Sequence, residues 1–182
     1  LVFFRQPLLS EGFGVLLEGD VAFHDHHALA RLTDAVDFDR QRKAVQKLIP
    51  VAEKAKVVIA LENVWNNLWV KPAFFTHFIA SFQCPWVQCY FDIGNHVKYA
   101  LPEEWIRSLG KLIVKCHVKD FKLNPDGHGG NFVDIRDGSI DWPLVRAELD
   151  KIGYNGWMTI EGSGGLSLEE RNSRLDLIVA GK

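Results

Sequence analysis

Residues 115–122 read KCHVKDFK and follow directly on the apolar run 112–114, Leu-Ile-Val. A near-continuous apolar run predicts a strand of a parallel sheet that is buried on both faces. The period of two along a strand places His117 and Lys119 on one face and sends Asp120 to the other, where a structural role is expected. The stretch therefore predicts a buried strand whose carboxyl end presents a histidine and a lysine.

Four further segments share this pattern. Short apolar runs rich in β-branched residues occupy residues 15–17, 57–61, 87–91, 112–118 and 157–160. The polar residues at or just after their ends are Glu18, Glu62, Asp92, His117 and Glu161. Helical patterns lie between and after the runs, in residues 40–54, 72–82, from 102, 141–153 and from 167. This alternation of strand and helix predicts an α/β fold.

Two α/β architectures compete, an open doubly wound sheet and a (β/α)8 TIM barrel. Ligand groups of open sheets gather at one switch point, whereas barrels take functional residues from the ends of several strands. The polar strand ends therefore favour the barrel. Because a full barrel has eight strands and about 250 residues, the 182 residues are interpreted as an N-terminally truncated portion. It would hold about five βα units in a single domain, 1–182.

Composition limits the classes of function. Hydrophobic residues make up 47% and charged residues 24% of the chain, as in soluble globular domains. The net charge of −2 offers no basic field for nucleic acid, and no apolar run approaches the roughly 20 residues of a membrane span. The chain lacks an initiating methionine and a signal-peptide pattern, which suggests a fragment or a processed product. Three unpaired cysteines, Cys84, Cys89 and Cys116, indicate reduced thiols in a cytoplasmic protein.

Four of the polar strand ends are expected to meet at one rim of the barrel. Glu62, Asp92 and Glu161 would place three carboxylates together, and their mutual repulsion would require a cation. With the imidazole of His117 they offer three oxygen ligands and one nitrogen. This set suits Mn²⁺ or Mg²⁺, with Co²⁺ or Zn²⁺ as further options. The alternative is that each acid caps a helix or lies in a solvated turn.

Four motifs at these strand ends are similar to those of a known family. They read IALENVWNN (59–67), YFDIGN (90–95), CHVKDFK (116–122) and MTIEGSGG (158–165). From about residue 50 onward the chain resembles the xylose-isomerase-like superfamily of sugar phosphate isomerases and epimerases. Its DIGN motif resembles the L-xylulose-5-phosphate 3-epimerase branch. The resemblance implies a TIM barrel in which the five predicted strands are the fourth to the eighth.

The resemblance also implies a metal-dependent sugar or sugar-phosphate isomerase or epimerase. Glu62, Asp92, His117 and Glu161 fall on the family's metal ligands, and Glu62 and Glu161 on its acid/base pair. One glutamate would remove a proton next to the metal-chelated carbonyl. The resulting enediolate would regain a proton from the second glutamate, at the same carbon in an epimerase or at the adjacent carbon in an isomerase.

Four residues near the rim are candidate substrate contacts: Asn95, His96, Lys119 and Arg136. Many relatives have a histidine three residues after the ligand aspartate, where this chain has Asn95, followed by His96. Asn95 either contacts a substrate hydroxyl or caps the turn after the strand. Lys119 either polarises a carbonyl or pairs with Asp92, and Arg136 either reaches the substrate or is solvated.

Three loops complete the set of candidates. The long connection 121–141 favours an active-site lid over a plain linker. The glycine-rich residues 162–165 precede a helix and would either hold a phosphate or form a flexible turn. The histidine-rich run 24–27 lies in the weakest-patterned part of the chain and is set aside as a metal site.

Three other functions stay open. The first is a sugar or polyol dehydratase of the same superfamily. The second is an endonuclease IV-type nuclease, which the charge of −2 and the single histidine ligand oppose. The third is a non-catalytic barrel fragment with exposed strand edges at 15–17 and 157–160. The identity of the sugar, its phosphorylation and a homo-oligomeric state are not determined by these patterns.

Overall fold

The structure, a computed structural model, describes residues 2–4, 35–65, 69–162 and 164–182. The main sheet has the strand order β1-β2-β3-β4-β7, and β5 pairs with β6 in a second sheet. The strands are β1 (Val2–Phe4), β2 (Val58–Glu62), β3 (Val87–Asp92), β4 (Ile113–Val118), β5 (Asp120–Leu123), β6 (Gly130–Val133) and β7 (Trp157–Ile160). The helices are α1 (Ala35–Ala55), α2 (Pro72–Ala80), α3 (Pro102–Leu109), α4 (Trp142–Lys151) and α5 (Leu168–Val179), with a 3₁₀ turn at Gly110–Leu112.

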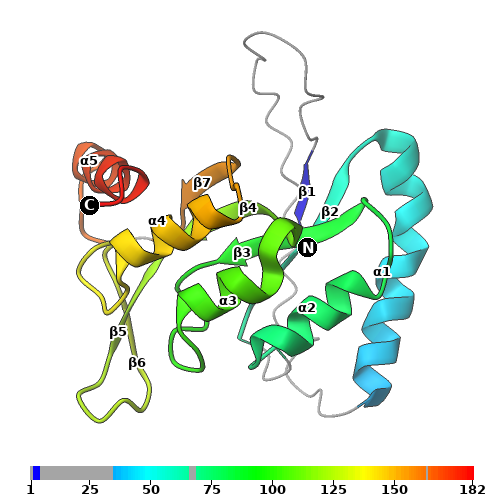
Figure 1. Ribbon diagram of the computed structural model, residues 1–182, viewed down its shortest axis with the longest axis horizontal. Helices are drawn as coiled ribbons and strands as arrows, with labels where there is room; N and C mark the ends of the chain where they lie inside the picture. Colours follow the sequence, from blue (N-terminus) through cyan, green and yellow to red (C-terminus); the bar gives the residue numbers. More distant parts are fainter. Residues whose placement is uncertain (1, 5–34, 66–68, 163) are drawn as a thin grey trace, which may run out of the picture.

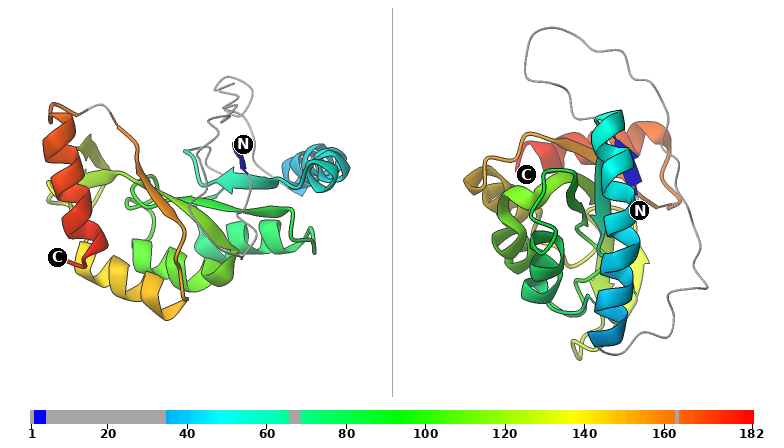
Figure 2. Two further views of the ribbon diagram at one scale, coloured as in Figure 1. Left: turned by 90° about the horizontal axis from the view of Figure 1, so that it is seen from above. Right: turned by 90° about the vertical axis from the view of Figure 1, so that its right-hand side faces the viewer.

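Strands β2, β3, β4 and β7 are parallel neighbours, and a helix lies between each of them and the next along the chain. Figures 1 and 2 show helices α1 to α5 in an arc along one face of this curved sheet. Parallel strands with helices on the outer face are the arrangement of a (β/α)8 barrel. The prediction of part of a barrel is thereby confirmed.

Four of the five predicted strands are observed within one residue of their predicted ends. The fifth, residues 15–17 with Glu18, and the histidine-rich run 24–27 lie outside the described residues. The sequence analysis missed β1, which pairs antiparallel to β2. A strand of three residues is too short to display a period.

The connection 121–141 is largely regular in structure, and its role as a lid stays a prediction. It contains most of the β5–β6 hairpin, in which Phe121 lies opposite Phe132. The Asn124 side chain donates to the His128 carbonyl at 2.7 Å, and the Gly127 N–H donates to the Asn124 carbonyl at 2.9 Å. The sequence Asn-Pro-Asp-Gly, which is typical of a turn, therefore indicated the structure of this segment better than its length did.

The predicted helix starts are confirmed where a cap marks them. Asp141 Oδ1 accepts from the Leu144 N–H at 2.9 Å and begins α4. Ser167 and Glu170 form the predicted capping box of α5. Helix α1 begins at Ala35, five residues earlier than predicted, and continues through Pro50 to Ala55.

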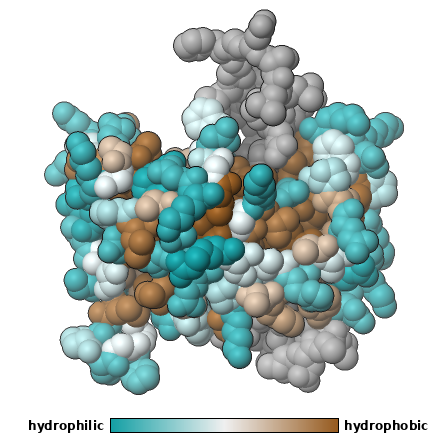
Figure 3. Space-filling view, in the orientation of Figure 1, coloured by the Kyte–Doolittle hydropathy of each residue, from teal (hydrophilic) through white to brown (hydrophobic). Residues whose placement is uncertain are grey.

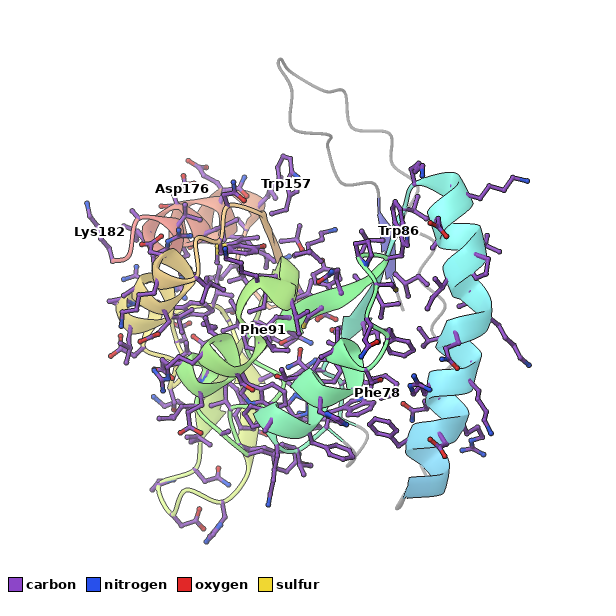
Figure 4. The ribbon with its side chains drawn as sticks, turned by 45° about the vertical axis from the view of Figure 1, so that its right-hand side comes forward. Phe78, Trp86, Phe91, Trp157, Asp176 and Lys182 are labelled. Atoms are coloured by element: carbon purple, nitrogen blue, oxygen red, sulfur yellow. The ribbon has the colours of Figure 1, made fainter. Side chains whose placement is uncertain are left out.

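The core lies between the sheet and the helices. Phe78 of α2 is buried against the rings of Phe38 in α1 and Trp69, with centroids 4.9 and 4.6 Å away, and Figure 4 shows it between the two helices. Trp105 of α3 packs on Phe91 of β3. The helix side in Figure 3 is hydrophilic at both flanks and hydrophobic near its middle. Within the described ranges, no helix combines the length and apolar character of a bilayer crossing.

Asp120 joins the hairpin to α4. Its side chain is fully buried, and its Oδ1 accepts from the Phe121 N–H at 2.8 Å. Its Oδ2 accepts from the backbone N–H groups of Arg136 (2.8 Å) and Gly138 (3.1 Å) and from Trp142 Nε1 (3.1 Å). A Cβ at position 138 would collide with this carboxylate, so glycine is required there. The predicted structural role of Asp120 agrees with these contacts.

Replacing Asp120 by alanine should lower the free energy of unfolding by about 3 kcal/mol or more, because four N–H donors, two of them in buried residues, would lose their acceptor. Urea unfolding followed by circular dichroism measures this. Asp176→Ala, on the exposed surface of α5, is the control and should change stability by less than about 0.5 kcal/mol. A loss below about 1 kcal/mol in Asp120→Ala would contradict the structural role.

Candidate metal centre

The four predicted metal ligands lie in one row at the carboxyl ends of the parallel strands. Glu62 ends β2, Asp92 ends β3, His117 lies in β4 and Glu161 follows β7. Because the strand order is β2-β3-β4-β7, the two glutamates occupy the ends of the row. Asp92 and His117 are paired in the register of β3 and β4 and fill its middle.

The side chains of this row converge. Each residue offers one ligand atom, and the four atoms all lie within 4.8 Å of one another. His117 Nδ1 lies 3.2 Å from Glu62 Oε1, 3.4 Å from Glu161 Oε2 and 3.9 Å from Asp92 Oδ2. One imidazole nitrogen thus faces three carboxylates, the donor set that suits a divalent cation.

Asp92 is oriented by its own turn. Its Oδ1 accepts from the N–H groups of Gly94 and Asn95, both at 2.8 Å. Its Oδ2 is buried without a hydrogen-bond partner, and the nearest described cation is Lys119 Nζ at 3.4 Å. A buried carboxylate oxygen without a donor is costly unless a cation faces it. The residues present therefore fit a metal ion.

The sequence analysis missed Asn63, which fixes the backbone of Asp92. Asn63 is fully buried. Its Oδ1 accepts from the Asp92 N–H at 2.7 Å, and its Nδ2 donates to the Asp92 carbonyl at 2.8 Å. The side-chain amide of Asn63 thus makes the two hydrogen bonds that a paired backbone would make, at the point where β2 and β3 end. The only sequence signal was a polar residue directly after Glu62.

His96 lies behind the row and not within it. Only 2% of its surface is exposed, and its ring stacks on Trp105 with centroids 4.8 Å apart. Its Nδ1 is 2.9 Å from Asn63 Nδ2 and accepts from it in the neutral ring. Burial and then the charge of Lys98 lower the pKa of His96 to about 4. The described contacts link His96 to Asp92 through Asn63, and this burial disfavours the predicted direct contact with substrate.

Lys119 and Asn95 lie beside the row. Lys119 Nζ is 2.8 Å from Glu161 Oε2 and 3.3 Å from Asn95 Oδ1. The predicted pairing of Lys119 with Asp92 is thus present together with a contact to Glu161. Burial alone would lower the pKa of Lys119, but the Asp92 and Glu161 carboxylates outweigh it and raise the pKa, so the ammonium stays charged.

Arg136 is placed differently from the other candidates. Its side chain is exposed, its φ is +76°, and its backbone N–H donates to Asp120. No described contact brings the guanidinium to the row, so its substrate contact stays a prediction. The same holds for the phosphate site at 162–165, because Ser163 lies outside the described residues.

The pKa values of Asp92 and Glu161 are shifted in opposite directions. Burial raises the pKa of Asp92 well above its ordinary value; Lys119 opposes the shift, and Glu161 adds to it. For Glu161 burial acts in the same direction, but hydrogen bonds with Asp92 and Lys119 outweigh it and lower the pKa. Without a metal ion Asp92 therefore releases its proton at a higher pH than Glu161 does.

Tyr90, also missed in the sequence, positions the imidazole. Its ring centroid is 4.0 Å from that of His117, and its hydroxyl lies 2.7 Å from Thr159 Oγ1. Thr159 is the register partner of His117 on β7. Such contacts hold the orientation of a ligand imidazole. They depend on pairing between strands, which a single strand motif does not reveal.

A sequence model described as "Xylose isomerase-like TIM barrel" matches residues 16–176. An uncharacterised protein of Methanocaldococcus jannaschii is 25% identical over 129 residues, which are 68% of this chain and 43% of that protein. The chain thus spans less than half the length of this curated relative.

Solved structures are also similar. A xylose isomerase domain protein from Planctomyces limnophilus has a TM-score of 0.69 at 22% identity, over 84% of this chain and 54% of that chain. A D-tagatose 3-epimerase-like protein has a TM-score of 0.67 at 21% identity, over 79% and 54%. A xylose isomerase-like TIM barrel protein from Mycobacterium smegmatis, in complex with magnesium, has 0.66 at 21%, over 83% and 53%. Other similar structures include L-ribulose 3-epimerase and a probable 3-DHS dehydratase. At these identities the likeness shows the fold, of which the chain spans about half.

Asp92→Asn should stabilise the metal-free protein by about 1–2 kcal/mol at pH 8, because it removes a costly buried carboxylate. Since the folded-state pKa of Asp92 is raised, its stabilising contribution is complete below the ordinary carboxyl pKa and is lost as pH rises through the raised value. The advantage of the variant should therefore shrink from pH 8 to pH 4. Denaturant unfolding in EDTA tests this, with the exposed Asp176→Asn as control. A less stable Asp92→Asn at pH 8 would contradict it.

Asn63→Ala should weaken Mn²⁺ binding by about 10- to 100-fold, the usual effect of losing a residue that orients a metal ligand. Isothermal titration calorimetry measures the affinity, and circular dichroism checks the fold. Asn172→Ala, on the exposed side of α5, should bind like the unaltered protein. Equal affinities in both variants would show that Asn63 does not position Asp92.

Proposed function

Because this chain belongs to the xylose isomerase-like TIM barrel family, we propose that it is a metal-dependent sugar or sugar-phosphate isomerase or epimerase. The observation that carries the proposal is the order of the ligand row, with Glu62 and Glu161 at its two ends. Two carboxylates so placed can serve one sugar carbon as acid and base from different sides.

The proposed metal ligands are Glu62, Asp92, His117 and Glu161. The buried Oδ2 of Asp92, which accepts no hydrogen bond from the described residues, supports an ion at this position. A set of three carboxylates and one imidazole suits Mn²⁺ or Mg²⁺. The magnesium complex of the similar Mycobacterium smegmatis protein supports the same class of ion. A bound ion would act as a Lewis acid on a carbonyl oxygen and acidify the neighbouring C–H.

The residues of this chain would then move the proton. Glu161 is the base, because its lowered pKa keeps it ionised at neutral pH. It takes the proton from the carbon next to the carbonyl, which leaves an enediolate. Glu62, at the far end of the row, returns a proton to that carbon in an epimerase or to the adjacent carbon in an isomerase. Asn95, whose Oδ1 lies 3.3 Å from Lys119 Nζ, is placed to contact a substrate hydroxyl, and Lys119 is a second candidate for contact with the substrate.

A dehydratase is the second candidate, since a probable dehydratase is among the similar structures. Removal of the same proton would be followed by loss of a β-hydroxyl in place of reprotonation. Product analysis by NMR separates the two reactions. Because the chain spans about half the length of its relatives, the activity of the whole protein, its sugar substrate and its cytoplasmic location remain proposals.

With Mn²⁺ the protein should exchange solvent deuterium into at least one member of a panel of ketoses and ketose phosphates. Glu161→Gln and Glu62→Gln should each reduce this exchange by about 100-fold or more, because amides do not transfer the proton. Proton NMR measures the exchange.

The matched control is Glu169→Gln on the exposed surface of α5, which should exchange at the normal rate. Calorimetric titration with Mn²⁺ separates the loss of a base from the loss of a ligand. No exchange with any compound, or unchanged exchange in both active-site variants, would rule out the enediolate mechanism.

A further inference from the structure

An aromatic wall lies at the same rim as the ligand row. It consists of Trp65, in the loop after β2, and Phe121 and Phe132, which lie opposite each other in the β5–β6 hairpin (Figure 1). The ring centroids of Trp65 and Phe132 are 5.0 Å apart with an interplanar angle of 30°. Phe121 packs edge-on against both, at 5.9 and 5.2 Å. Segments far apart in the chain therefore build one continuous aromatic surface.

Two members of the aromatic wall are open to solvent. Phe121 is buried, whereas 46% of Trp65 and 43% of Phe132 are exposed. A single exposed aromatic residue is ordinary, but an adjoining pair at the rim of a site marks a binding surface. The pair is far too small for a stable protein partner, which would cover about 800 Å². The exposed surface fits a small molecule.

The aromatic wall is continuous with the ligand row. Lys119 Nζ lies 4.9 Å from the centre of the Phe132 ring and 2.8 Å from Glu161 Oε2. Trp65 Nε1 donates to the carbonyl of Asn95, whose side chain contacts Lys119. A molecule held at the row would therefore meet Trp65 and Phe132 with its remaining atoms.

Polar groups border the aromatic wall. Lys98 Nζ lies over the Trp65 ring, 3.4 Å from its centre, and Lys119 and Asn95 lie on the side of the ligand row. Aromatic rings with a few hydrogen-bonding groups around them match a sugar ring, which has apolar C–H faces and hydroxyls at its edge.

We propose that Trp65 and Phe132 bind the C–H face of a sugar ring, the part of the substrate remote from the reacting carbons. This inference rests on the proposed function and narrows it to substrates of hexose size or larger, including glycosides. Compounds of three or four carbons would fill the ligand row without reaching the aromatic wall.

The test uses methyl β-D-glucopyranoside, a ring-locked probe that cannot isomerise, with Mg²⁺ held at saturation. The chain has six tryptophans, and the indole N–H signal of Trp65 is identified in a ¹⁵N NMR spectrum by its loss in Trp65→Phe. Titration with the glycoside should shift this signal saturably. Trp157, 66% exposed at the edge strand β7 (Figure 4), should not respond.

Phe132→Leu should weaken binding of the glycoside by about three- to tenfold, the value of one aromatic contact. Phe74→Leu is the matched control, because Phe74 is 41% exposed on α2 and packs on Phe38 and Trp69. It should bind the probe normally. The proposal would be overturned if the Trp65 signal did not shift on titration, or if both variants bound the glycoside equally weakly.

The two proposals fail in different ways. A saturable Trp65 shift without deuterium exchange into any ketose supports the aromatic wall and counts against the isomerase chemistry. Deuterium exchange without a Trp65 shift, even with hexoses, leaves the isomerase chemistry standing and overturns the aromatic wall. Glycerol, which is too short to span both regions, should leave the Trp65 signal in place.

Discussion

Repulsion among three carboxylates is the constraint on which this end of the molecule depends. Parallel register brings Glu62, Asp92 and Glu161 together because each lies at the end of a neighbouring strand. Within the described residues, Lys119 lies against two of these carboxylates, and burial raises the pKa of Asp92. A buried acid with a raised pKa makes the metal-free fold less stable at neutral pH. The site thus costs stability, as sites prepared for a ligand commonly do.

The two faces of β4 have different roles, one in the apolar core and one at the ligand row. Cys116 and Val118 are fully buried and belong to the apolar core beneath the helices. His117 and Lys119, on the opposite face, contact the carboxylates. Asp120 returns to the core side and holds α4 to the hairpin. The alternation along β4 therefore places core residues on one face and His117 and Lys119 on the other.

Features with a local signal could be predicted from the sequence, and features made by pairing could not. The strand ends, the cap of α4 and the four converging side chains of the row follow from apolar runs and the residues after them. Asn63, Tyr90 and Trp65 gave no such signal, because each acts on a residue of another element: Asp92, His117 and Phe132. The short β1 and the hairpin within 121–141 also depend on a partner strand, and a chain alone does not display its partner.

Lys119 contacts both the ligand row and the aromatic wall. It follows β4, so its position is set by the sheet, and its ammonium contacts Glu161, Asp92 and Asn95 while lying over the Phe132 ring. Under the proposed function, a divalent ion would compete with Lys119 for the same two carboxylates. The ammonium would then be left to a substrate hydroxyl or to the aromatic wall. Metal binding and sugar binding would thereby be coupled through one side chain, because both draw on the same charge.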